Sequence, residues 1–398
     1  MFQHKIQVPP VTPKAVRQSE LMMGLPIALL AGLSLSVGPT TYGARMTQFG
    51  TKLFSAIGSS EGKNDLVSPL SVYDCLGLLA PAVSGSTESA LLTGLIYAPN
   101  ESAAFISDFH DHCVSMSRPH SGVLMANAVW TRPGLALSSA YQTTISNSFM
   151  ASATPLVGLG AQGASQINQW VEQNTKGRIS SLFSGLPAST SIILTNAIAF
   201  DGTWVKAFDE RRTQPQTFHG EGGDTKAPMM CRTGIIRYAT SDHSEVAVLP
   251  YKEGESMWIG LPTAGNGPAD AMGDLTAAPQ TSSQNVDLQL PKFTYSCTYS
   301  LNAALKKIGF ASLFAAADFS RMTVGSAPDR ISEVIQKTYI KVDEKGTQAA
   351  AVTGIVMPTA VMRPPASPIP FHVDRPFAFA IKDDQTGAVL FMGVVRKI

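Results

Sequence analysis

Charged side chains are scarce in this sequence. Of its 398 residues, 15% are charged and 44% are hydrophobic, and the formal net charge is +1. Nucleic-acid-binding proteins usually carry a clear basic excess, so we expect no nucleic-acid partner. The composition is that of a globular protein with a large core, and the length alone would allow two or three domains.

Cysteines and catalytic motifs are also sparse. Neither a metal-binding spacing nor a disulfide framework links the four cysteines, which favours buried free thiols: Cys75, Cys113, Cys231 and Cys297. The sequence contains no His-Glu-x-x-His motif and no phosphate-binding loop, so we predict no enzyme activity, no cofactor and no metal. Asp111-His112-Cys113 combines reactive residue types, but no partner stands at a useful spacing, and we predict no metal or nucleophilic site there.

One long apolar run stands near the N-terminus. Leu21–Val37 contains no charged side chain over 17 residues. With basic residues before it and the small Thr41 and Gly43 after it, the run is typical of a secretory signal peptide cleaved after Gly43. A membrane anchor through residues 21–37 is the alternative, because 17 residues is the lower limit for a spanning helix. We therefore expect a secreted protein, with a signal peptide or hydrophobic segment at 1–43 and a folded domain at 44–398.

Hydrophobic periodicity predicts many helices and strands between residue 44 and the C-terminus. The expected helices are 44–57, two ending at Leu79 and Leu95, 138–150, 165–179 and 300–308. The expected strands are 123–130, 154–157, 192–200, 229–250, 257–262 and 286–293. Residues 263–285 are rich in small and polar side chains, so we expect them to be exposed and loosely structured.

A segment of small side chains lies late in the chain. Val342–Gly354 opens with charged residues, has a glycine at 346, and then runs through three alanines. Alanine loses almost no side-chain entropy when it is ordered, and valine and threonine favour an extended backbone. The residues alone leave two interpretations open, a mobile loop able to form a strand and an ordinary surface linker.

Several motifs resemble the serpin family, in the order in which that family has them. They are the hinge at 342–353, Ser-Pro-Leu-Ser at 68–71, Thr-Lys-Gly-Arg-Ile at 175–179, Leu-Pro-Lys at 290–292, and the C-terminal segments 371–381 and 387–395. The resemblance covers roughly Met46–Val395. It implies one large α+β domain with the serpin fold, three β-sheets, about eight or nine helices and an exposed reactive-centre loop.

The same resemblance implies a function. Serpins inhibit serine proteases as suicide substrates, trapping the acyl-enzyme by inserting the cleaved reactive-centre loop into the main β-sheet. The implied partner of this chain is thus a serine protease, and we expect the chain to be a monomer. A non-inhibitory serpin, acting as a binding protein or chaperone, is the alternative. No charged or bulky residue stands between 347 and 353 to block insertion, which favours the inhibitor.

The resemblance also assigns site residues. The hinge residues are Glu344, Gly346, Thr347, Ala349, Ala350, Ala351, Val352 and Thr353. The residues of the gate beneath the sheet and of the point of insertion are Ser68, Ser71, Asn196, Trp204, Lys292 and Gln336. The family usually has histidine where this chain has Gln336, but glutamine can also donate and accept. Lys292 and Glu344 are expected to form an exposed ion pair, which would contribute about 0–1 kcal/mol.

The reactive bond follows from the family's spacing. Counting Glu344 as the first hinge position, the bait residue falls seventeenth, which places the cut between Ala360 and Val361. The alternative is Met362–Arg363. A cut after Arg363 is disfavoured, because the proline that follows lacks an N–H and restricts the residue before it. Small or apolar bait residues suit elastase- or chymotrypsin-like proteases.

Activation by a glycosaminoglycan is not expected. Serpins that bind these polyanions carry basic side chains on the helix that corresponds to residues 96–120. Here acidic residues and histidines dominate, and Arg118 is the one Lys or Arg in that range. Asn100-Glu101-Ser102 is the one glycosylation sequon in the sequence.

Overall fold

The computed structural model describes residues 41–58, 62–116, 122–347 and 367–398. Within these ranges the chain forms eight α-helices. Their bounds are α1 Tyr42–Ile57, α2 Pro69–Gly77, α3 Gly85–Gly94, α4 Ser102–Met116, α5 Ser139–Asn147, α6 Gly160–Asn174, α7 Pro268–Ala277 and α8 Asn302–Leu305. Shorter helical turns are η1 Glu210–Arg212, η2 Lys306–Phe310 and η3 Ala311–Phe314.

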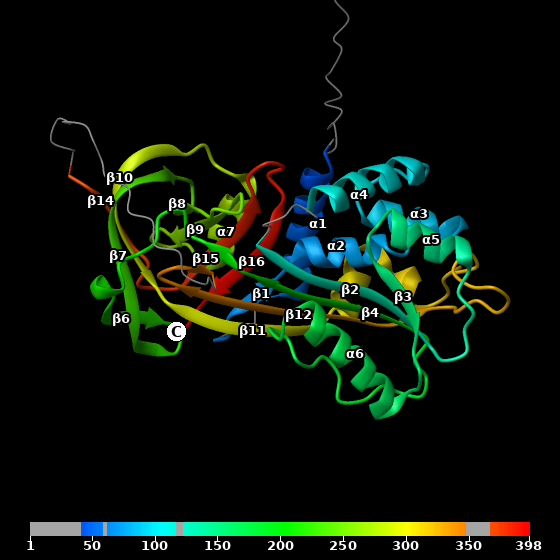
Figure 1. The fold of residues 1–398 in the computed structure, drawn as a ribbon. Coiled ribbons are helices and arrows are strands. Elements are labelled where there is room, and N and C mark those ends of the chain that lie inside the picture. The colour runs from blue at the N-terminus through cyan, green and yellow to red at the C-terminus, as the bar shows by residue number, and fades with distance from the viewer. Residues whose placement is uncertain (1–40, 59–61, 117–121, 348–366) are drawn as a thin grey trace, which may run out of the picture. The chain divides into compact units, whose positions relative to one another are not determined.

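A seven-stranded sheet forms the centre of the molecule (Figure 1). Its order is β3-β2-β4-β12-β13-β5, and β11 also pairs with β12. The bounds are β2 Val123–Thr131, β3 Ser152–Pro155, β4 Ile192–Phe200, β5 Gly202–Thr203, β11 Phe293–Ser300, β12 Ile331–Asp343 and β13 Gly346–Thr347. The neighbours β4 and β12 run parallel, whereas β13 is antiparallel to β12 and to β5.

The other strands form one nine-stranded sheet. Its order is β1-β16-β15-β9-β8-β7-β10-β14, with β6 also paired to β7. The bounds are β1 Asp65–Val67, β6 Gln214–Gly220, β7 Gly223–Thr240, β8 Ser244–Pro250, β9 Glu255–Pro262, β10 Ser282–Pro291, β14 Ile369–His372, β15 Phe377–Asp383 and β16 Val389–Val395. The described strands thus join into two sheets where we expected three. The long β7 pairs with β6 along one half and with β10 along the other, which links two groups of strands.

The central strand β4 is buried along its whole length, which explains its continuous apolar sequence. On one face, Leu194 and Ile198 belong to the core that includes α1 and α2. On the other face, Ile193 and Ala197 pack in a smaller core with α6, which lies across the sheet (Figure 1). Both faces of the seven-stranded sheet are therefore covered by helices.

Two expectations about the second half of the chain were wrong. Residues 263–285, expected to be loose, contain helix α7 and the start of β10. A capping bond from the Gly267 N–H to Asp270, at 2.9 Å, begins α7, and its Leu275 side chain is fully buried. The helix expected at 300–308 is shorter, because β11 extends to Ser300 and Gly309, with a φ of 113°, interrupts the helical turn that follows α8.

Smaller details also differ from the expectations. Helix α6 begins at Gly160 and ends at Asn174, where 165–179 was expected. All four cysteines are free thiols, but only Cys75 is fully buried. Helix α1 begins at Tyr42, with Thr41 as its N-cap, and the domain boundary at residue 44 stays a prediction. None of the described helices is both long and apolar enough to cross a membrane.

Candidate functional site

Three side-chain amides form a row across the seven-stranded sheet. Asn127 on β2 is the register partner of Asn196 on β4, which in turn is the partner of Gln336 on β12. Register partners on adjacent strands project to the same face. Asn196 Nδ2 donates to Asn127 Oδ1 at 2.9 Å, and Gln336 Nε2 donates to Asn196 Oδ1 at 2.6 Å. This amide row (Asn127, Asn196 and Gln336) links three strands at one level.

The amide row is hydrogen-bonded to the N-terminus of α2. Gln336 pairs with the backbone of Ser68 in both directions: its Oε1 accepts from the Ser68 N–H at 3.2 Å, and its Nε2 donates to the Ser68 carbonyl at 2.9 Å. Ser71 Oγ donates to Asn127 Oδ1 at 3.0 Å. Ser68 Oγ accepts from the Ser71 N–H, which caps α2, and donates to the Leu390 carbonyl.

These contacts bring together the four gate residues that we assigned from the sequence. Ser68, Ser71, Asn196 and Gln336 are all completely buried. A buried polar group that loses its partner costs about 1–3 kcal/mol, so the network holds the strands in one register. The Gln336 amide accepts from the Ser68 N–H and donates to the Ser68 carbonyl and to Asn196, so it uses both its donor and its acceptor group.

Asn127 is the residue of this network that we did not identify from the sequence. Its Oδ1 accepts from both Ser71 and Asn196. The available signal was a single amide in the middle of the apolar run Val123–Trp130. An amide inside a strand with apolar neighbours needs a buried partner, and that need is a reason to consider such a residue in a site.

The hinge enters the sheet with two residues. Gly346 and Thr347 form strand β13 between β12 and β5, opposite Val342–Asp343 on one side and Gly202–Thr203 on the other. Gly346 has a φ of 154°, and a Cβ at this position would lie 2.1 Å from the Gly202 carbonyl oxygen. The sheet therefore accepts only a glycine at 346 without a rearrangement.

Thr347 is completely buried, and its hydroxyl hydrogen-bonds the Tyr251 hydroxyl at 2.6 Å. The Tyr251 ring stacks on Trp204, with centroids 4.2 Å apart and planes 13° apart. The side chain of the first hinge residue expected to enter the sheet thus already lies in the core.

The segment from Trp204 to Phe208 holds the turn at 344–345. Trp204 donates twice, from its backbone N–H to the Lys345 carbonyl and from Nε1 to the Asp343 carbonyl, both at 3.0 Å. The Phe208 N–H donates to the Glu344 carbonyl at 2.8 Å. Trp204, which we placed at the point of insertion, therefore fixes the start of the hinge by bonding its backbone carbonyls.

Glu344 anchors the same turn through its side chain. Lys292 Nζ lies 2.7 Å from Glu344 Oε2, and Thr213 Oγ1 donates to Oε1 at 2.8 Å. The expectation of an exposed ion pair was wrong for one partner, because the Glu344 side chain is only 8% exposed, against 36% for Lys292. Burial raises the pKa of the Glu344 carboxyl, but the bonds from Lys292 and Thr213 outweigh it, and the pKa is lowered overall.

The remaining assigned residues lie outside the described part of the chain. They are the hinge residues Ala349, Ala350, Ala351, Val352 and Thr353 and the reactive-site residues Ala360, Val361, Met362 and Arg363. Their assignments stay predictions. Within the described ranges, no cluster of His, Cys, Asp and Glu side chains could hold a metal ion.

Known proteins resemble this chain over most of its length. The sequence profile of a family described as "Serpin (serine protease inhibitor)" matches residues 44–398. Serpin-Z1C of Triticum aestivum is 32% identical over 381 residues, covering 88% of this chain and 95% of that protein. The solved structure of Serpin48 from the insect Tenebrio molitor superposes with a TM-score of 0.80 at 25% identity, covering 90% of this chain and 98% of that one.

Human thyroxine-binding globulin, solved as a complex with its ligand, also has this fold. Its TM-score is 0.79, and the match covers 89% of this chain and 98% of that one. At 23% identity, the likeness shows the fold alone.

Acid is expected to remove the contribution of Glu344 to stability. Its folded-state pKa is below the unfolded value of about 4.3, so the contribution is present above pH 4.3 and is lost as the pH falls through the folded pKa. At pH 7, Glu344→Gln should lower the free energy of unfolding by about 1–3 kcal/mol. This difference from the parent protein should shrink between pH 5 and pH 3, in denaturation series measured at each pH.

Glu172→Gln, at an exposed position on α6, is the matched control and should change stability little at any pH. If the effect of Glu344→Gln were the same at pH 7 and pH 3, it would arise from packing, and the ion pair would not stabilise the hinge.

Proposed function

The chain belongs to the serpin family, and we propose that it is a suicide-substrate inhibitor of serine proteases, which acts as a monomer. Serpins are protease inhibitors and not enzymes. The observation that carries the proposal is β13, the two-residue strand at the start of the loop. It lies beside β12, antiparallel to it, as a strand inserted between the parallel β4 and β12 would lie.

Insertion of the loop requires β4 and β12 to separate. Eight register pairs hold the two strands together, from Ile331↔Ile192 to Tyr339↔Ala199. The bond between Gln336 and Asn196 crosses the same boundary. An inserted strand of about 14 residues could add a similar number of backbone hydrogen bonds at about 1 kcal/mol each. The gain, on the order of 10 kcal/mol, is comparable to the stability of a whole domain.

The same step would move a protease attached to the loop. Each residue of a strand advances about 3.3 Å, so full insertion carries the acylated enzyme some tens of ångströms. The trap acts when this displacement distorts the enzyme's active site before the acyl bond is hydrolysed. Insertion must be faster than hydrolysis of the acyl bond. If it is slower, the protease is freed and the inhibitor is left as an ordinary cleaved product.

The side chains of the hinge agree with this proposal. Thr347 already fits into the core beside Tyr251, and residues 347–353 contain no charged or bulky side chain. A non-inhibitory role as a binding protein or chaperone is the second candidate. Its support is the shared fold of human thyroxine-binding globulin, which carries no information about this hinge.

We propose further that the target is an elastase- or chymotrypsin-like protease. The bait residue would be Ala360, with the cut before Val361, or alternatively Met362, with the cut before Arg363. We also propose that the protein is secreted after removal of its hydrophobic N-terminus, with anchoring through residues 21–37 as the alternative. The cleavage position affects helix α1, because the Tyr42 hydroxyl donates to Asp74 at 3.0 Å. A cut after Tyr42 would remove this bond.

Thr347→Arg should convert the inhibitor into a substrate. The guanidinium would have to be buried without a partner where the Thr347 hydroxyl now meets Tyr251. Gel electrophoresis after incubation with an elastase-like protease should show cleaved protein and no SDS-stable complex. Lys345→Arg, in the exposed turn before β13, is the control and should keep the complex. An SDS-stable complex formed by Thr347→Arg at the parent stoichiometry would rule out insertion.

The reactive bond can be located from the peptide that the complex releases. Mass spectrometry of the C-terminal fragment should give a first residue of Val361. A fragment beginning at Arg363 would move the bait residue to Met362. A fragment beginning at Pro364 would contradict the steric argument against a cut after Arg363.

N-terminal sequencing of protein from its native source tests secretion. A first residue at or near Ala44 is expected. A start at Ala44 would remove the hydrogen bond from Tyr42 to Asp74, whereas a start at Thr41 would keep it. Soluble protein that retains Met1 would refute signal cleavage, and membrane-bound protein that retains residues 1–43 would establish the anchor.

A further inference from the structure

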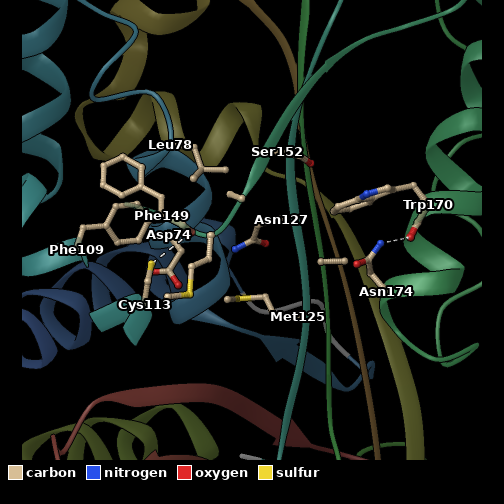
Figure 2. Close-up of a pocket in the computed structure, with 13 residues that line it drawn as sticks. Asp74, Leu78, Phe109, Cys113, Met125, Asn127, Phe149, Ser152, Trp170 and Asn174 are labelled. Carbon is tan, nitrogen blue, oxygen red and sulfur yellow. Dashed lines mark hydrogen bonds between the residues drawn. The ribbon is translucent and has the colours of Figure 1, made fainter. Parts of the chain in front are cut away.

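A cavity of about 370 Å³ lies beside β2, and residues from both faces of the seven-stranded sheet line it (Figure 2). Its walls come from α2, α4, β2, the segment that leads into β3, and α6. This volume falls within the range of about 300–1,000 Å³ that is usual for small-molecule sites. The hinge and the point of insertion contribute no residue to it.

The cavity arises where β2 has no strand on its outer side. Strand β3 pairs with β2 only from Ala128 to Thr131. Before that point β2 pairs with β4 on its inner side, and Met125 and Asn127 line the cavity. Met150, with a φ of 50°, turns the chain just before β3 begins, and it also lines the cavity.

Aromatic and thioether side chains form one part of the lining. Phe109 of α4 and Phe149 lie with ring centroids 4.4 Å apart and planes 44° apart. Figure 2 shows both rings on one side of the cavity, with Leu78 above them and Met125 near the strand. Such walls favour a flat apolar group, because aromatic rings and methionine sulfur pack well against another ring.

Asp74 is the single charged side chain among the residues that line the cavity. It is 95% buried, since its side chain is only 5% exposed. Its Oδ1 accepts from the Tyr42 hydroxyl at 3.0 Å, and its Oδ2 lies 3.3 Å from His112 Nε2. A carboxylate can accept about four hydrogen bonds, so the carboxylate that borders the cavity retains acceptor capacity.

Asn127 supplies a second polar group to the cavity. Its Oδ1 already accepts from Ser71 and Asn196. Figure 2 shows its amide nitrogen on the side of Asp74 and Phe149. Ser152 and Asn174 also belong to the lining, which therefore combines one carboxylate, two amides, a hydroxyl and an apolar wall, and includes no basic side chain.

We propose that this cavity binds a small arylalkylamine, with the ammonium group on Asp74 and the aromatic ring against Phe109 and Phe149. An ammonium group can be buried here because Asp74 pairs with it, whereas a carboxylate ligand would meet like charge. A fully hydrophilic cation would leave the apolar walls uncovered. An amine joined to one ring matches Asp74 and the two phenyl rings together.

Calorimetric titration of the full chain with three matched probes tests the charge preference. The probes are 3-phenylpropylammonium, the neutral 3-phenylpropanol and the anionic 3-phenylpropionate, which share one apolar body. The ammonium probe should bind at least tenfold more tightly than the alcohol, and the carboxylate should bind most weakly. Equal affinities for the three probes, or no binding of any of them, would overturn the proposal.

Two variants place the binding in this cavity. Asp74→Asn keeps the shape of the side chain and should bring the affinities of the ammonium probe and the alcohol to within about twofold of each other. Ala151→Phe fills the cavity from its lining and should abolish binding of all three probes. Asp111→Asn, at an exposed position on α4, is the charge-matched control and should change nothing.

The unfolding midpoint of each variant shows whether it is folded. A folded Asp74→Asn protein that kept the tenfold preference, or a folded Ala151→Phe protein that still bound the ammonium probe, would refute the assignment. Should Asp74→Asn fail to fold, the probe series on the parent protein and the Ala151→Phe result decide the question.

Discussion

The pairing of β4 with β12 is the constraint on which the rest of the site depends. Backbone hydrogen bonds hold the two strands together, and the 2.6 Å bond from Gln336 to Asn196 adds a side-chain link across the same boundary. The Ser68 backbone bonds Gln336, and Ser71 of α2 bonds Asn127, the next member of the amide row. Because Ser68, Ser71, Asn196 and Gln336 are all buried, the boundary opens only when several hydrogen bonds are lost together.

At the other end of β12, the hinge is held against the sheet by different means. Trp204 and Phe208 donate to carbonyls of the turn, and Lys292 and Thr213 hold the Glu344 side chain. None of these contacts reaches past Thr347. These contacts fix the chain as far as Thr347, and the amide row is a separate set of contacts about ten residues back along β12.

Local patterns in the sequence predicted local structure well. The apolar run 192–200 is β4 residue for residue, and the motifs of the hinge led to Glu344, Gly346 and Thr347. Local patterns could not reveal contacts between residues that are distant in the sequence. Asp74 contacts His112, which lies 38 residues later in the sequence. The motif Asp111-His112-Cys113, for which we found no partner at a useful spacing, therefore has one. Helix α7 was missed because alanine and glycine hide its amphipathic spacing.

The two-residue strand β13 has a kinetic consequence. A strand that grows into a sheet must first order a few residues against little gain, and only then does each added residue gain a hydrogen bond. In this protein Gly346 and Thr347 are already paired on both sides. In the mechanism that we propose, growth of the loop into the sheet starts from these two paired residues, and its rate is set by how fast β4 and β12 separate ahead of it.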